Sequence, residues 1–162
     1  TLTQRNTQKT FNFVEEKLKE NIEQELAILN LISVDKSFFD IEQIFGFLSN
    51  YGAVLNNKYF SYVDENGNEI FRIANALNPG TFESDTKTFA IVIASNLSST
   101  EDPVNAIKSM IKFSINFSEK FHANLCDEER TPITKQMISH IESRAQDIAR
   151  MKQLKNLSSE DK

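Results

Sequence analysis

The chain has 162 residues, of which 40% are hydrophobic and 25% charged, the composition of one globular domain with a sizeable core. Its net charge is −5 and its Lys and Arg residues form no cluster, which argues against a nucleic-acid-binding surface. No apolar run approaches the roughly 18 residues of a membrane span, and the single cysteine, Cys126, excludes an intrachain disulfide and a thiolate metal cluster.

The first two elements are a helix and a strand. The segment TFNFVEEKLKENIEQEL has apolar residues at helical spacing, with charged residues between them, at Phe11, Val14, Leu18 and Ile22. This pattern predicts an amphipathic helix, so residues 1–24 are expected to form a helical N-terminal extension. The next segment, Leu26–Ser33, is short and apolar, which predicts a buried strand.

A second helix and a hairpin follow. The segment SFFDIEQIFGFLSNYG repeats apolar residues at helical spacing, at Phe38, Ile41, Phe45 and Leu48. Ser37 is the predicted N-cap and Gly52 the C-terminal stop. Two alternating runs then flank Asn66-Gly67, a dipeptide favoured where both central residues of a turn need positive φ. These runs predict an antiparallel hairpin with a tight turn.

The second half of the chain begins with another strand and another helix. Thr88–Ser95 is apolar and rich in β-branched residues, which favours a strand. Either Thr100 or Asp102 is expected to cap the following helix, because Pro103 suits its first turn.

The last elements complete the fold class. The segment FHANLC, residues 121–126, is a candidate short strand, and Thr131-Pro132 is expected to open a long helix over residues 133–150. Because a hairpin lies in the middle and strands do not strictly alternate with helices, we predict an α+β fold, an antiparallel sheet with helices packed on one face. Residues 25–155 are the predicted domain and residues 156–162 a disordered tail.

The titratable residues predict no catalytic or metal centre. Neither His122 nor His140 has a carboxylate or nucleophile at a telling spacing. The segment DENGNE resembles the start of a calcium loop, but Asn75 stands where that loop needs a bidentate glutamate. We therefore expect a protein that is not an enzyme and that has no cofactor.

The two faces of the predicted sheet differ in the size of their side chains. Alternate strand residues face opposite sides, so one face is bulky and suits packing against helices. The other face is expected to carry small and medium apolar residues: Leu26, Ile28, Phe60, Ala74, Ala76 and Val92. Such a face is either a docking groove or is covered by a helix or by the N-terminal extension.

The segment RIANALNPGTF resembles the strand and turn of the C-terminal domain family of the bacterial cell-division protein ZipA. The resemblance extends to ILNLIS, SNYGAVL and LCDEERTPITKQM, and covers roughly residues 25–152. It implies a six-stranded antiparallel sheet with three helices and a shallow apolar groove that binds the C-terminal peptide of FtsZ. Carried over by position, the groove residues are Leu26, Ile28, Lys58, Phe60, Ala74, Ala76, Asn78 and Val92.

The resemblance also implies a biological setting. It implies a cytoplasmic domain at the division site that links FtsZ polymers to the bacterial inner membrane, through an N-terminal anchor that this chain does not include. The chain has Lys58 and Ala76 where the family often places methionine, and Asn78 where it places lysine. The alternative is an α+β domain that uses the same face for a different peptide or for weak self-association.

Overall fold

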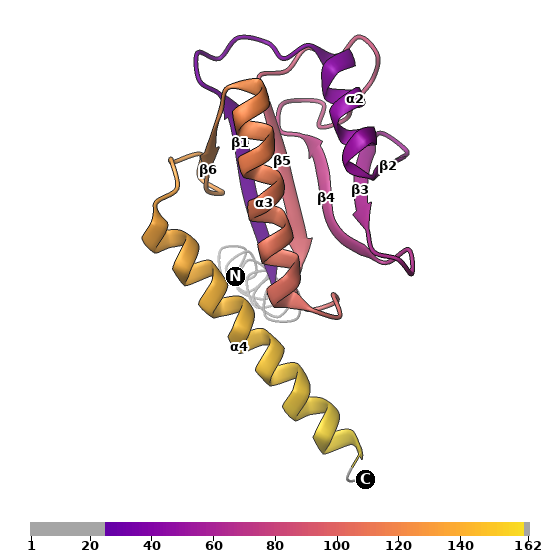
Figure 1. Ribbon diagram of the computed structural model, residues 1–162, viewed down its shortest axis with the longest axis vertical. Coiled ribbons are helices and arrows are strands. Elements are labelled where there is room, and N and C mark those ends of the chain that lie inside the picture. The colour runs from indigo at the N-terminus through magenta and orange to yellow at the C-terminus, as the bar shows by residue number, and fades with distance from the viewer. Residues whose placement is uncertain (1–24, 161–162) are drawn as a thin grey trace, which may run out of the picture.

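The computed structural model describes residues 25–160, with side chains described through residue 156 (Figure 1). The helix predicted within residues 1–24 lies outside these described residues. The described elements, in chain order, are β1 (Leu26–Ser33), α2 (Ile41–Tyr51), β2 (Ala53–Asn56), β3 (Tyr59–Val63), β4 (Glu69–Asn75), β5 (Ala90–Asn96), α3 (Pro103–Phe121), β6 (Ala123–Cys126) and α4 (Lys135–Glu160).

The six strands form one sheet in the order β2-β3-β4-β5-β1-β6, and all neighbouring strands are antiparallel. Helices α2 and α3 lie over the same face of this sheet, and α4 packs against α3 (Figure 1). The predicted α+β class is therefore confirmed, together with the six strands and three helices that the resemblance implied.

The caps of α2 and α3 explain where these helices begin. Asp40 caps α2 by accepting hydrogen bonds from the amides of the first turn, so the prediction of Ser37 as N-cap is wrong. The Ser37 amide and hydroxyl both donate instead to the carboxylate of Asp35. Asp102, one of the two residues predicted, caps α3 ahead of Pro103. Gly52 ends α2 at φ 103°, as predicted.

The hairpin between β3 and β4 is confirmed, but its turn is longer than predicted. Gly67 has φ 83° and its amide donates to the Asp64 carbonyl, while the Asp64 amide donates to Asn68. This is a three-residue loop with a left-handed glycine in third place, and Asn66 is not among the positive-φ residues. The pairing then shifts by one residue at Ile70, so the rest of β3 and β4 pairs as it would around a two-residue turn at Asn66-Gly67.

Helix α4 begins later and ends later than the sequence predicts. It starts at Lys135, where the hydroxyl of Thr134 accepts from the amide of Met137, rather than at residue 133. It continues to Glu160, beyond residue 156 at which we expected a disordered tail to begin. Its last turns extend away from the sheet (Figure 1).

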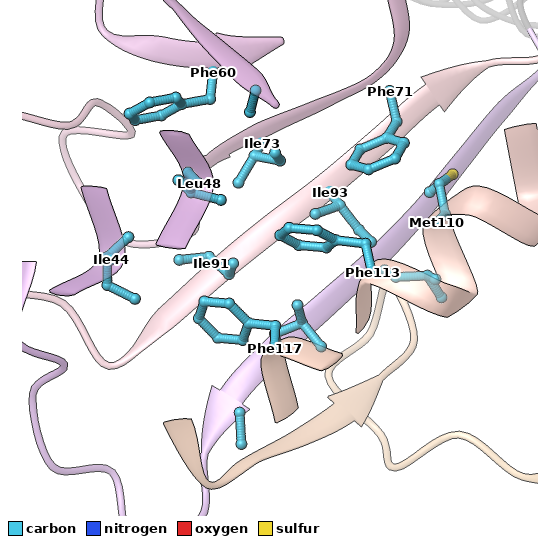
Figure 2. Packing of buried hydrophobic residues seen from close by; sticks show 14 of the residues in the cluster. Ile44, Leu48, Phe60, Phe71, Ile73, Ile91, Ile93, Met110, Phe113 and Phe117 are labelled. Carbon is cyan, nitrogen blue, oxygen red and sulfur yellow. The ribbon is translucent and has the colours of Figure 1, made fainter. Parts of the chain in front are cut away.

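The core lies between the sheet and helices α2 and α3, and it is built largely from phenylalanine. Figure 2 shows Phe71, Phe113 and Phe117 among isoleucines of β4 and β5. These three phenylalanines are at most 1% exposed. One face of the sheet is therefore fully used by packing, which leaves the opposite face to be considered as a site.

Candidate peptide-binding face

The strand register defines the residues of the sheet face that points away from α2 and α3, here called the outer face. Directly paired residues point to the same side of a sheet. Ala74 pairs with Val92, which pairs with Asn30, and the neighbouring row joins Ala94 to Ile28. The residues on alternate positions, such as Ile73 and Ile93, are fully buried against the helices.

Five of the eight predicted groove residues lie on the outer face. The structure brings together Leu26, Ile28, Ala74, Ala76 and Val92. Leu26 is 53% exposed and the other four are partly exposed. The structure thus shows an apolar strip of small and medium side chains over β1, β5 and β4.

Phe60 is not part of this face, so its predicted position is wrong. It pairs with Ile73, which places its ring on the side of the helices, and it is only 3% exposed. Its ring centroid lies 5.7 Å from that of Phe45 and 5.9 Å from that of Phe82. Figure 2 shows it in the core with Ile73 and Leu48. The ring that does belong to the outer face is that of Tyr59.

Lys58 and Asn78 lie in exposed turns beyond the ends of the strands. The Lys58 ammonium pairs with the Glu83 carboxylate at 2.6 Å, and this hydrogen bond raises the pKa of Lys58. The Lys58 carbonyl accepts from the amide of Phe82. Asn78 is exposed and precedes Pro79. Neither residue is on the apolar strip itself.

The Asn-Pro-Gly turn that follows β4 is held by a buried asparagine. Asn75 is 4% exposed; its amide nitrogen donates to the Thr81 carbonyl and its amide oxygen accepts from the Leu77 amide. Gly80 has φ 85°, and its amide donates to the Leu77 carbonyl. Phe82 then returns to the core. The motif therefore fixes where β4 ends.

One residue that the sequence analysis did not select, Arg130, reaches this region. The Asp127 carboxylate accepts from the amides of Glu129 and Thr131, which fixes the turn after β6. The buried amide of Asn30, on the outer face, donates to the Asp127 carbonyl. From this turn the Arg130 guanidinium reaches the Ala76 carbonyl, at 3.3 Å. No local sequence pattern predicts a contact between residues 54 positions apart.

A polar cluster borders the strip on β3 and β4. The Glu69 carboxylate accepts from the Arg72 guanidinium at 3.0 Å and from the Ser61 hydroxyl at 3.1 Å. The Arg72 guanidinium also lies 4.1 Å from the centre of the Tyr59 ring. The hydrogen bond from Arg72 to Glu69 raises the pKa of Arg72, so its charge is kept.

The titratable residues of the described chain do not converge. His122 is the exposed left-handed C-cap of α3, and His140 is exposed on α4. Cys126 is buried in β6, and burial raises the pKa of its thiol. Within residues 25–160, no group of three His, Cys, Asp or Glu side chains could hold a metal ion.

The fold and this face together define an α+β domain whose sheet is packed on one side and carries an apolar strip on the other. The chain belongs to the family described as ZipA, C-terminal FtsZ-binding domain, whose model matches residues 25–144. This match confirms the family that the sequence motifs suggested.

Relatives named as cell division protein ZipA support a cell-division role. The protein from Pseudomonas aeruginosa is 28% identical over 128 residues, which cover 74% of this chain and 44% of that protein. The protein from Azotobacter vinelandii is 32% identical over 89 residues, which cover 52% of this chain and 31% of that protein. The chain thus spans less than half the length of these two relatives.

Proposed function

We propose that this chain binds the C-terminal peptide of FtsZ along the outer face of its sheet, as a non-enzymatic module of bacterial cell division. The observation that carries the proposal is the apolar strip of Leu26, Ile28, Ala74 and Val92, which is left partly exposed although the opposite face is fully packed. A sheet face that met only water would be mostly polar. The family description, an FtsZ-binding domain, supports this choice of partner.

The composition of the strip suits an extended or helical peptide with apolar anchors. Three of its side chains are short, so a second backbone can come close to β4 and β5; these are Ala74, Ala76 and Ala94. Leu26 and Val92 supply apolar area around these low positions. At the end of β4, the exposed Arg130 guanidinium, which follows the acidic residues Asp127, Glu128 and Glu129, offers hydrogen-bond donors to a polar group of the peptide.

We further propose that the complete protein links FtsZ polymers to the inner membrane, with this domain on the cytoplasmic side at the division site. Among the described residues, no helix is long and apolar enough to cross a membrane.

The test is a titration of the chain with a synthetic peptide of the FtsZ C-terminus, followed by backbone amide shifts and by calorimetry. Shifts should centre on Ala74, Val92 and Ala94. Ala74→Glu should leave the fold intact, because Ala74 is partly exposed, and should weaken binding by about 2 kcal/mol, or about 30-fold, because it desolvates a charge in the complex. Leu55→Glu is the matched control, because Leu55 is 54% exposed on the edge strand β2.

Three outcomes would contradict the proposal. Unchanged affinity of a folded Ala74→Glu variant would exclude the outer face as the site. Equal binding of a peptide with the same composition in scrambled order would exclude FtsZ as the specific partner. A dimer that light scattering detects in the wild type and that Ala74→Glu dissociates would show that the face serves self-association.

A further inference from the structure

A second apolar surface adjoins the outer face at Leu26 and Ile28, in a groove between β1, α3 and α4. The groove has a volume of about 650 Å³. Its apolar, partly exposed side chains come from four elements and one turn: Ala27 from β1, Ile111 from α3, Leu125 from β6, Met137 and Ile141 from α4, and Ile133 from the turn before α4. An exposed apolar groove of this kind indicates a surface that another segment or molecule covers.

The groove exists because β6 covers only half of β1. β5 pairs with β1 from Leu26 to Ile32, but β6 pairs with its other edge only from Asn30 to Ser33. The edge at Leu26–Leu29 therefore has no neighbouring strand among the described residues. Proteins protect such a free edge by covering it with a helix or a loop.

The entrance of the groove is the point at which the described chain begins. Glu25 is the first described residue. Its carboxylate accepts a hydrogen bond from the Arg144 guanidinium at 2.5 Å, and Arg144 is at the end of the groove lining on α4. The Glu25 amide and carbonyl are held by Ser98 and Leu97. Residues 1–24 therefore join the domain at one end of this groove.

We propose that residues 10–24 of the same chain occupy this groove as an amphipathic helix. Their apolar stripe can pack against the apolar lining of the groove; it consists of Phe11, Val14, Leu18 and Ile22. The stripe spans 12 residues, or about 18 Å of helix at about 1.5 Å per residue. The groove lining on α4 runs from Gln136 to Arg144, about 14 Å of helix, and Ile133 in the preceding turn extends it, so the two lengths are comparable.

The connection is also of the right length. A helix that ends near Ile22 leaves residues 23–25 to turn into β1, and connections of about 2–6 residues are usual between a helix and a strand. The helix would run antiparallel to β1 and along the free edge. The matched family model begins at residue 25, so the proposal adds an element to the domain and does not depend on the function proposed above.

The experiment compares two variants of the full chain that introduce the same residue. Leu18→Gln replaces a stripe residue, and Glu16→Gln changes the opposite side of the predicted helix while keeping a good helix former. Leu18→Gln should shift the backbone amide resonances of Ala27, Ile111 and Met137 and lower Tm by about 2–8 °C. Glu16→Gln should do neither.

A groove variant completes the test from the other side. Met137→Gln should shift resonances of residues 14–22, whereas Lys135→Gln, at an exposed position next to the groove, should not. The proposal is overturned if Leu18→Gln changes no resonance in the groove, or if it shifts Ala74 and Val92 on the outer face instead. It is also overturned if light scattering shows a dimer in which the groove shifts depend on protein concentration, because the occupant is then the segment of a second copy.

Discussion

Replacing Phe60 with alanine should destabilise the domain without changing the residues of its outer face. The Phe60 side chain is 3% exposed, and its ring touches those of Phe45 and Phe82 at centroid distances of 5.7 and 5.9 Å. Phe→Ala substitutions in a core cost about 3–5 kcal/mol, because apolar burial is lost and a cavity remains. The site is close to the edge strand β2, where neighbours can relax, so we expect about 3–4 kcal/mol.

The assay is urea unfolding followed by circular dichroism, with Tyr59→Ala as the control. Tyr59 is the adjacent residue on the opposite face, partly exposed and stacked on Arg72, so its loss should cost no more than about 1 kcal/mol. The expected loss for Phe60→Ala lowers Tm by about 6–16 °C in a chain of this length. The assignment of Phe60 to the core is refuted if Phe60→Ala lowers the free energy of unfolding by less than Tyr59→Ala does and also abolishes peptide binding.

Two further predictions concern the turns. Asn75→Ala should lower the free energy of unfolding by about 1–3 kcal/mol in the same urea assay, because the partly buried Thr81 carbonyl and Leu77 amide lose their partner, while Asn78→Ala in the exposed turn should change it by less than about 0.5 kcal/mol. Equal effects would show that Asn75 does not hold the turn. Hydrogen bonds from the Ser37 hydroxyl and amide, and from the Ser33 hydroxyl, lower the pKa of Asp35 from 3.8 to about 2. The ionised Asp35 therefore stabilises the fold above about pH 4, and this contribution is lost as the pH falls toward 2. Ser37→Ala should raise the Asp35 midpoint in an NMR titration; an unchanged midpoint would contradict this cause.

Much of the fold could be predicted from local patterns, because each element has its own periodicity and its own end signals. Pro103 and the helical spacing of the residues after it mark α3, and Asn66-Gly67 marks the hairpin. The start of α2 could not be predicted with the same precision, because Ser37 and Asp40 are both good N-cap residues. The Asp35 carboxylate decides between them, since it binds the Ser37 amide and hydroxyl and leaves Asp40 to cap the helix.

The site was harder to predict because it depends on register and on contacts between distant residues. In β3, the alternation alone does not say which face points to the helices. The register of the hairpin does show which face points to the helices, because it pairs Phe60 with the buried Ile73. The three-residue loop and the bulge at Ile70 each shift this register by one residue, in opposite directions, so the two shifts cancel. The contact of Arg130 with Ala76 depends on the turn after β6, and the sequence holds no local signal for it.

The structure separates the residues that identify the family from those that would recognise a partner. In the most specific motif, Asn75 to Phe82, three residues stabilise the turn itself. Asn75 is buried, Gly80 supplies a left-handed turn position, and Phe82 packs in the core. The outer face is made of alanines and a few larger apolar residues, of which Ala76 lies within the motif and Leu26, Ile28, Ala74, Val92 and Ala94 lie outside it. A chain can therefore keep the motif, and with it the end of β4, while the shape of the strip beside it changes. It follows that the presence of the motif establishes the fold, and that partner choice has to be tested at Ala74, Val92 and Arg130.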